Sequence, residues 1–260
     1  MGLKNTLRSY TPEAILDMVG QLKVAVLPLR LYVAGVYFSY FKKIYRKNGI
    51  VLNIPFDLTD TKFRGRFPLN RYEKEESEYL PKYLSPDAKV LELGSCLGYI
   101  SCITNKILAD KTQHVVLEAN PNLMKWIEKN RADNNCEFHI EHSIISKEKK
   151  NVFFIHRLIV GGSTKRETPN RVEVNGVNFE DLRKKYNVDF DTLIMDIEGG
   201  ELELFRQFKD NIASFKQLFF EVHPFANILT KAEAKECEDI LSSIGFKNVL
   251  KDGNFQIWEK

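Results

Sequence analysis

Acidic residues and a histidine directly follow two short apolar runs near the C-terminal part of the chain. Asp196 and Glu198 come after TLIM, and Glu221 and His223 come after LFF. The carboxyl ends of neighbouring parallel strands meet at one edge of a sheet, so the four side chains are expected to converge. Carboxylates and neutral imidazole can take a proton from a substrate, which makes Asp196, His223 and Glu198 candidate catalytic residues.

Two other arrangements are open for the same residues. Asp196, Glu221 and His223 could hold a divalent ion such as Mg²⁺ or Mn²⁺, which would lower the pKa of a bound hydroxyl. Glu198 and Glu201 flank two glycines that open a helix, where an acid can instead stabilise the helix dipole.

A glycine-containing turn stands earlier in the chain, in VLELGSCLGYIS at residues 90–101. It places Gly94 and Gly98 between a strand and a helix, but it lacks the further glycine of a dinucleotide-binding turn. Glu118 ends the next strand, 24 residues after Gly94, where an acid can accept hydrogen bonds from both hydroxyls of a ribose. An adenosine ligand without a diphosphate, whose positive centre Glu92 could favour, is S-adenosylmethionine.

At this point the sequence resembles the FkbM-type S-adenosylmethionine-dependent methyltransferases. The resemblance runs from about Tyr79 to Trp258, and MDIEGGE at residues 195–201 is its most distinctive segment. Other ordered segments are VLELGSCLGYIS, VVLEANPN, HSIIS, GGST, VNFEDL and FFEVH. The glycine turn departs mildly from the family, which often has Asp-x-Gly-Ala-Asn there. The residues before about 70 lie outside the resemblance.

The resemblance implies a role for several individual residues. The methionine side of the cofactor would be lined by Glu92, Gly94, Ser95, Gly98 and Tyr99. Glu118 would hold the ribose with Asn120 beside it, and Ser143 would lie near the adenine. Asp196 would lie by the reacting centre. Alternatives remain, since Tyr99 could be a core aromatic, and Glu118 could be a solvated acid at a strand end.

The family resemblance also implies the reaction, which is methyl transfer to a hydroxyl, with a sugar nucleotide or glycan as the acceptor. The loop HRLIVGGSTKRETPNR at residues 156–171 is basic and contains glycines. Lys165 and Arg166 are candidate substrate-binding residues that could meet a phosphate or carboxylate on the acceptor. The alternative is an ordinary solvated loop.

Apolar runs alternate with helical patterns from about residue 70 to the C-terminus. This pattern predicts an α/β fold with a doubly wound, seven-stranded, mostly parallel sheet and a C-terminal antiparallel hairpin around Asp252 and Gly253. The resemblance makes it a Rossmann-like class I methyltransferase domain over residues 70–260. Residues 1–69 are expected to form an N-terminal helical or irregular extension.

The stretch VAVLPLRLYVAGVYFSYF at residues 24–41 allows three interpretations. Arg30 and Pro28 argue against a membrane-spanning helix. A helix packed on the main domain or on another subunit, and a basic helix lying on anionic lipid, are the other two. Residues 1–66 carry 11 Lys and Arg against 4 Asp and Glu, so peripheral membrane binding or self-association through residues 24–41 is expected to involve an anionic partner.

The composition limits the remaining choices. A net charge of +3 without a long basic run gives no support for a nucleic-acid partner. The four cysteines show neither metal-binding nor disulfide-scaffold spacing, and the N-terminus lacks the pattern of a secretion signal, so a cytoplasmic protein is expected. Two rival functions stay open: a nicotinamide-dependent oxidoreductase on sugar nucleotides, and a non-catalytic membrane-associated protein with a vestigial cofactor site.

Overall fold

The computed structural model describes residues 12–224 and 229–260, with side chains from residue 25 onward. By internal contacts the chain divides into two units. The smaller unit contains the chain up to Lys43 together with Thr59–Tyr72, and the larger contains Ile44–Leu58 and Glu73–Lys260. Residues 44–58, which the sequence predicts to belong to an extension over residues 1–69, are grouped by their contacts with the larger unit.

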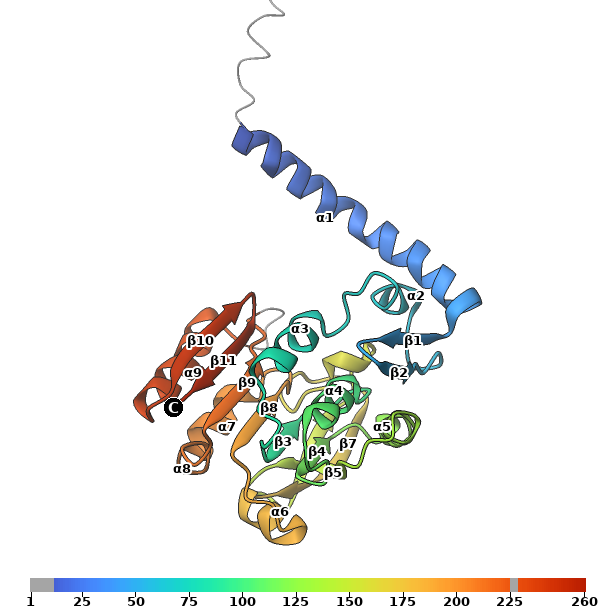
Figure 1. The fold of residues 1–260 in the computed structure, drawn as a ribbon. Helices are drawn as coiled ribbons and strands as arrows, with labels where there is room; N and C mark the ends of the chain where they lie inside the picture. The colour runs from blue at the N-terminus through green and yellow to red at the C-terminus, as the bar shows by residue number, and fades with distance from the viewer. Residues whose placement is uncertain (1–11, 225–228) are drawn as a thin grey trace, which may run out of the picture. The chain divides into compact units, whose positions relative to one another are not determined.

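The larger unit is built on a mixed sheet of nine strands in the described part of the chain (Figure 1). The strands are β3 (Val90–Leu93), β4 (His114–Glu118), β5 (His139–Ile145), β6 (Lys150–Phe154), β7 (Arg171–Val177), β8 (Thr192–Met195), β9 (Gln217–Glu221), β10 (Lys247–Asp252) and β11 (Phe255–Glu259). Their order is β10-β11-β9-β8-β3-β4-β5-β7-β6. Five neighbouring strands from β9 to β5 are parallel, and β10 and β11 form the predicted antiparallel hairpin.

The seven predicted strands are all present, and β6 and β7 extend the sheet beyond them at the β5 edge. β7 pairs parallel to β5 and antiparallel to β6. These two strands are not among the seven that the sequence predicts. Both strands carry charged residues among their apolar ones, so they lack the continuous apolar runs of the central strands.

Helices connect the parallel strands and make the sheet doubly wound. They are α3 (Lys74–Tyr83), α4 (Tyr99–Ile107), α5 (Pro121–Asp133), α6 (Phe179–Tyr186), α7 (Glu201–Gln207), α8 (Lys209–Ile212) and α9 (Lys231–Ser243). Local sequence explains where several of them begin. Asn120 accepts a hydrogen bond from the Asn122 amide ahead of Pro121, and Thr230 forms a capping box with Glu233.

The middle of the sheet is its driest part, because β3, β4 and β8 are buried along their whole length. Continuous apolar runs such as VLEL, HVVLE and TLIM are typical of parallel strands covered on both faces. Four polar residues are nevertheless buried in these strands, namely Glu92, His114, Glu118 and Thr192. The strand ends, not the strand interiors, therefore carry the accessible chemistry.

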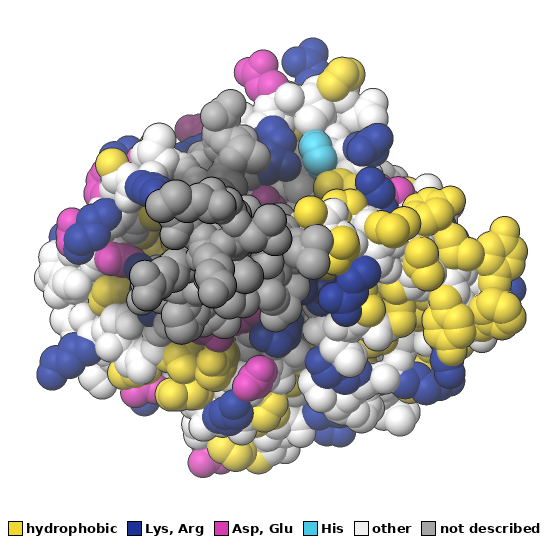
Figure 2. Space-filling model, turned by 90° about the horizontal axis from the view of Figure 1, so that it is seen from above, with side chains coloured by type: hydrophobic (Ala, Val, Ile, Leu, Met, Phe, Trp, Pro, Cys, Tyr) yellow, Lys and Arg dark blue, Asp and Glu magenta, His cyan; other side chains and the backbone are white. Residues whose placement is uncertain are grey.

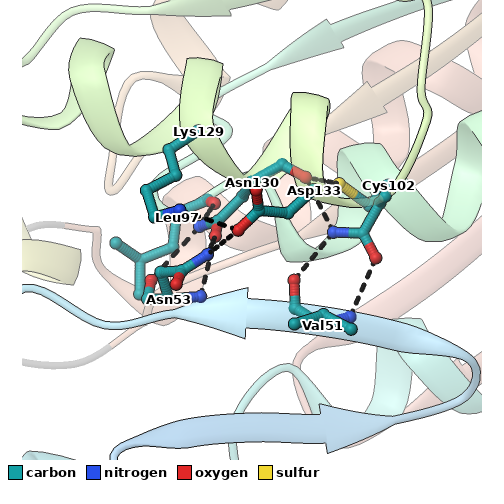
Figure 3. A network of polar contacts seen from close by, with 8 residues as sticks. Val51, Asn53, Leu97, Cys102, Lys129, Asn130 and Asp133 are labelled. Atoms are coloured by element: carbon teal, nitrogen blue, oxygen red, sulfur yellow. Dashed lines mark hydrogen bonds and ion pairs between the residues drawn. The ribbon is translucent and has the colours of Figure 1, made fainter.

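A short hairpin, β1 (Ile44–Lys47) with β2 (Ile50–Asn53), is attached to α5 by side-chain amides (Figure 3). Asn134 accepts from the Val51 amide at 2.8 Å and donates to the Val51 carbonyl at 2.7 Å. Asn130 accepts from the Asn53 amide at 2.7 Å and donates to the Leu97 carbonyl at 2.9 Å. The two amides thus bond to β2 as a neighbouring strand would, which holds the hairpin on the larger unit.

The smaller unit contains the long helix α1 (Pro12–Tyr37), a π-helical turn at Phe38–Lys42, and α2 (Thr61–Arg64). Gly35 and Gly65 allow the backbones of α1 and α2 to touch. A Cβ on Gly35 would lie 1.7 Å from the Thr61 carbonyl oxygen, and one on Gly65 would lie 1.9 Å from that of Leu31. None of the described helices combines the length and apolar character needed to cross a bilayer.

Candidate active site

A cavity of about 360 Å³ opens beyond the carboxyl ends of β3, β4, β5 and β8. Its polar lining includes Glu118, Asn120, Ser143, Asp196 and Glu198. Its larger apolar lining includes Leu117, Ile144, Ile145, Phe153, Ile159, Leu204 and Phe208. An apolar cleft with a few convergent polar groups is the usual form of a small-molecule site, and in a doubly wound sheet it lies at this edge.

Glu118 is held rigidly at the end of β4. One carboxylate oxygen accepts from the Cys96 amide at 2.9 Å and the other from the Asn120 amide at 2.7 Å. Burial raises the pKa of Glu118 to about 7, although these backbone amides oppose the shift. Each carboxylate oxygen has a second lone pair, so Glu118 retains the capacity to accept two ligand hydroxyls.

Two buried serine hydroxyls lack a hydrogen-bond partner among the described residues, namely Ser143 Oγ and Ser95 Oγ. Ser143 lines the large cavity, and Ser95 lines a much smaller one of about 20 Å³ beside it. An unpartnered buried hydroxyl costs free energy that a ligand can recover. The residues therefore fit a polar ligand that reaches both cavities, as S-adenosylmethionine would.

The two glycines of the turn both have a positive φ, but only Gly94 is crowded by a neighbouring backbone. Gly94 has φ +84°, and a Cβ there would lie 1.9 Å from the Asp196 carbonyl oxygen. Gly98 has φ +73°, and its nearest neighbour would be Ile127 at an ordinary 3.4 Å. Glycine at position 94 thus admits the backbone that directly follows β8. Gly94 still lines both cavities.

Gly98 and Tyr99 lie outside the lining of both cavities. Tyr99 is fully buried, its ring lies 5.7 Å from that of Tyr45, and its hydroxyl accepts from Asn48 Nδ2 at 3.4 Å. The structure thus places Tyr99 in the core, which was the alternative that its apolar neighbourhood left open. Asn120 lines the large cavity while its side chain caps α5.

Glu92 lines the small cavity, but both its oxygens have partners inside the protein. Ser101 Oγ donates to one, and His114 Nε2 lies 3.1 Å from the other. The carboxylate is 2% exposed and His114 is completely buried. Glu92 therefore stands beside the expected methionine end of a cofactor with its hydrogen-bonding capacity largely used.

Asp196, Glu198, Glu201 and Glu221 surround His223. Its Nε2 lies 3.6 Å from an Asp196 oxygen and 3.8 Å from Glu198 and Glu221, and its Nδ1 lies 3.7 Å from Glu201. Burial alone would lower the pKa of His223, but the negative charges and the Glu201 contact outweigh it and raise that pKa to about 11. His223 is thus an imidazolium near neutral pH, which makes it a poor proton acceptor.

The acids of this cluster are held in an unfavourable environment. Loss of hydration raises the pKa of Asp196 well above its ordinary value, and Glu221, Glu73 and Glu198 add to the shift while His223 opposes it. Asp196 Oδ1 accepts no hydrogen bond from the described residues. Asp196 lines both cavities, so it combines access to a ligand with an unused lone pair.

The donor set of Asp196, Glu221 and His223 partly fits a divalent ion. One potential ligand atom from each lies within 4.8 Å of the others. Carboxylate oxygens suit Mg²⁺ and Mn²⁺, but an imidazole ligand must be neutral, and the surrounding carboxylates favour its charged form. An ion at this position would therefore have to displace a proton from His223.

The basic loop lies beside the same cavity. Ile159, Val160, Gly162 and Thr164 are part of its lining. Arg166 contributes indirectly, since its guanidinium lies 3.6 Å from a Glu198 oxygen and donates to the Gly161 carbonyl at 3.3 Å. Lys165 is exposed, and neither Lys165 nor Arg166 is part of that lining.

Sequence reasoning missed three features of the site. Phe153 on β6 lines the large cavity, and Glu76 on α3 lines the small one. Cys96 and Glu198 adopt φ +49° and +51°, a left-handed backbone conformation that is uncommon for non-glycine residues. Only the position of Glu198, directly before a glycine pair, carried a signal for such a turn.

Comparisons with known proteins agree with this geometry. The sequence matches the family described as Methyltransferase FkbM domain over residues 92–247, which is more than half of the chain. No curated protein matches the sequence.

Similar solved structures include an O-methyltransferase from Bacillus cereus in complex with SAH, at 10% identity and a TM-score of 0.46, covering 90% of this chain and 100% of that one. A precorrin-6y C5,15-methyltransferase from Geobacter metallireducens shares 15% identity with a TM-score of 0.44, covering 71% of this chain and 84% of that one. A protein of the NADB-Rossmann superfamily from Streptococcus agalactiae shares 11% identity with a TM-score of 0.44, covering 71% and 67%.

The sheet order, the ligand-sized cavity at the strand ends and the match over residues 92–247 lead to one identification. The chain belongs to the FkbM methyltransferase family.

Proposed function

We propose that the protein transfers a methyl group from S-adenosylmethionine to a hydroxyl of a sugar nucleotide or glycan. One observation carries the proposal: a single cavity contains a buried acid suited to a ribose, Glu118, and an acid suited to take a proton, Asp196. Family membership supports methyl transfer, and the family resemblance is the source of the hydroxyl and carbohydrate assignments.

The cofactor supplies a methyl group on a sulfonium, which is a good leaving group, so alignment of the acceptor oxygen contributes much of the rate. The residues at the ends of β4 and β5 orient the nucleoside. Glu118 accepts from the ribose hydroxyls, and Ser143 Oγ offers a hydrogen bond on the neighbouring strand. The apolar lining excludes water from the adenine side.

Asp196 is the proposed general base. It lines both cavities, and its Oδ1 is unused by the described residues, whereas His223 lies outside both linings. His223 acts as a positioning residue, because its Nε2 lies 3.6 Å from Asp196 and balances part of the charge of the cluster. Glu198 lines the large cavity as well and completes the acidic wall.

A divalent ion on Asp196, Glu221 and His223 is the second candidate for activating the hydroxyl, supported by the closeness of their ligand atoms. The two arrangements differ in their response to EDTA. Retained methyl transfer in EDTA supports Asp196 as the base, whereas loss of transfer that Mn²⁺ or Mg²⁺ restores supports the ion.

The acceptor is proposed to approach from the side of residues 156–171. Arg166 lies next to Glu198, and the exposed Lys165 is adjacent to it in the chain. An anionic acceptor would find both cations near the mouth of the large cavity, and a bidentate contact to phosphate or carboxylate suits Arg166.

The proposal is tested by incubating the protein with methyl-labelled S-adenosylmethionine and a panel of sugar nucleotides and glycans, then locating the label by mass spectrometry. Label on a carbohydrate oxygen is the expected result. Label on protein, lipid or nitrogen would overturn the acceptor assignment. Binding of a nicotinamide cofactor but not of S-adenosylhomocysteine in calorimetry would overturn the reaction.

A further inference from the structure

The small cavity beside the glycine turn is unusually acidic. Four carboxylates line it in addition to Glu92, namely Glu73, Glu76, Glu221 and Asp196. Its other lining groups include the Ser95 hydroxyl and the apolar Phe219 and Phe255. Among the described residues that line it there is no Lys, Arg or His. A recess of this kind favours a small cation.

Two buried polar atoms point to a ligand in this recess. Glu76 is only 6% exposed, and its Oε1 accepts no hydrogen bond from the described residues. Ser95 is 5% exposed, and its Oγ is likewise without a partner there. Glu92 differs from both, because Ser101 and His114 already occupy its oxygens.

The size and position of the recess narrow the choice of cation. Its volume of about 20 Å³ holds one group the size of a water molecule or an ammonium. It shares Leu93, Gly94, Cys96 and Asp196 with the large cavity. A ligand whose ribose lies on Glu118 could therefore extend past Gly94 and place its far end in the recess.

We propose that Glu76 and Ser95 bind the α-ammonium group of the cofactor's methionine moiety, with Glu73 and Glu221 supplying further negative charge. This inference rests on the proposed function, which supplies the cofactor. It moves the cation contact from Glu92 to the helix α3. Glu92 then serves to hold the floor of the recess through its bonds to Ser101 and His114.

The test compares Glu76→Gln with the wild type in calorimetric titrations with two ligands. S-adenosylhomocysteine carries the ammonium, whereas 5′-methylthioadenosine lacks the amino-acid end. Hydrogen bonds to charged groups predict a loss of roughly 10- to 100-fold in affinity for S-adenosylhomocysteine and less than about 2-fold for methylthioadenosine. Glu78→Gln, which alters an exposed acid of the same helix, should change neither affinity.

Further measurements separate the possible failures. The thermal midpoint of Glu76→Gln without ligand should equal or exceed that of the wild type, because burial and the nearby Glu73, Glu221 and Asp196 all disfavour a carboxylate at this position. Equal loss for both ligands would overturn the inference. So would a loss that appears only with added Mn²⁺ and vanishes in EDTA, since the recess would then bind a metal. Failure of the wild type to bind either ligand would instead count against the proposed function.

A second feature lies on the smaller unit and is independent of the first. Leu29, Val33, Tyr37, Tyr40 and Phe41 recur at helical spacing and are exposed, Tyr40 and Phe41 by 75% and 76%. The opposite side of the helix buries Gly35 and Phe38. Figure 2 shows hydrophobic side chains gathered over this end of α1, with Lys and Arg at the border of the area.

The charges around this apolar face have one sign. Arg30, Lys42 and Lys43 are exposed, and residues 25–43 contain no Asp or Glu. Tyrosines and phenylalanines next to basic residues suit the headgroup region of a membrane, where lysine and arginine reach the phosphates. An anionic membrane surface attracts each nearby basic residue by about 1 kcal/mol, and this attraction adds to the apolar contact.

The geometry points to this face, defined by Leu29, Val33, Tyr37, Tyr40 and Phe41, as a surface that binds anionic membranes. It is tested by co-sedimentation of the full chain with two kinds of vesicle. One contains phosphatidylcholine alone, and in the other roughly one third of the lipid is phosphatidylglycerol. The wild type should bind the anionic vesicles preferentially, and less so at high salt. Tyr40→Ser with Phe41→Ser should weaken binding about 10-fold or more, whereas Val249→Ser, an exposed apolar residue of β10, should not.

Self-association is the outcome that would replace this assignment. If sedimentation velocity without lipid shows an oligomer that the Tyr40 and Phe41 variant loses, and neither vesicle binds the wild type, the face joins copies of the chain. Equal binding of neutral and anionic vesicles would also overturn the role given to Arg30, Lys42 and Lys43.

Discussion

Two pairs of an acid and a histidine come from neighbouring strands of the sheet, one pair within the strands and one just beyond them, and they are built differently. Glu92 and His114 are sealed in the sheet, 3.1 Å apart, and Ser101 completes the hydrogen bonds of the acid. Asp196 and His223 stand beyond the strand ends, 3.6 Å apart, with Asp196 31% exposed on its side chain. The first pair is saturated within the protein, and the second is not.

The difference shows which pair supports the fold and which supports chemistry. A buried group with all its bonds made has nothing left for a ligand, and its removal leaves partners unsatisfied. The second pair contains unpartnered atoms on Asp196 and His223 among the described residues, in a cluster with more negative than positive charge. That cluster is costly to the free protein and available to a substrate.

The largest effect that would test this contrast is on the rate of methyl transfer. Asp196→Asn removes the proposed proton acceptor at constant size, so the transfer rate should fall by about 10²- to 10⁴-fold. The thermal midpoint should stay within a few degrees, because the amide relieves repulsion from Glu221 and Glu73. Asp189→Asn, at an acid that is 89% exposed on its side chain, is the matched control. A wild-type rate in Asp196→Asn would remove this residue from the chemistry.

Glu92→Ala should act on stability. It leaves His114 Nε2 and Ser101 Oγ without their partner in a dry sheet, so the free energy of unfolding should fall by about 3 kcal/mol. Urea denaturation measures this change, with the exposed Glu128→Ala as the control. An unchanged unfolding midpoint would mean that the Glu92 and His114 contact does not stabilise the fold, and the contrast between the two pairs would disappear.

The positions of the central strands and the edge of the sheet that carries the site could be predicted from the sequence, because they follow from strand periodicity. Apolar runs of four or five residues located β3, β4, β8 and β9, and strand-end logic placed Glu118 and Asp196 at one edge of the sheet. These features depend on residues that are close in the chain.

The features that could not be predicted depend on distant residues. Glu92 is saturated because His114 and Ser101 come from another strand and from α4, and its own segment carries no trace of them. In the sequence Glu76 is one of several acids on a charged helix, and only tertiary packing places it at the recess. The charged strands β6 and β7 lack the continuous apolar runs that marked β3, β4 and β8.

Glu118 shares features of both acid–histidine pairs, since its oxygens accept hydrogen bonds from backbone amides and the residue still lines the cavity. Glu118→Ala should weaken binding of S-adenosylhomocysteine by roughly 1 to 3 kcal/mol, the cost of lost hydrogen bonds to a charged group. Calorimetry measures the affinity, and Glu128→Ala again serves as the control. Unchanged affinity would assign Glu118 to the turn at Cys96 and Asn120 alone.

The smallest expected effect is a pH dependence that separates the contribution of Glu118 to stability from its contribution to ligand affinity. Its pKa of about 7 in the free protein is above that of an ordinary glutamate, so its contribution to stability is present at low pH and is lost as the pH rises through 7. Ribose hydroxyls donate to the ionised form, so affinity for S-adenosylhomocysteine should instead rise with pH and level off above about pH 8.

Because affinity should rise with pH while stability falls, comparing the wild type with Glu118→Gln tests both effects of this carboxyl group. Between pH 6 and pH 8 the ionised fraction of a group with a pKa of about 7 rises about 10-fold, so the wild-type affinity should increase by up to about that factor. The variant should lack this increase. Over the same interval the wild type should lose stability relative to the variant, because the variant has no carboxylate to ionise in the dry site. A wild type and variant with parallel pH profiles would show that Glu118 keeps its proton, or never carries one, in both states. The ribose contact would then need another acceptor, and Asn120 on the same wall of the cavity is the next residue to change.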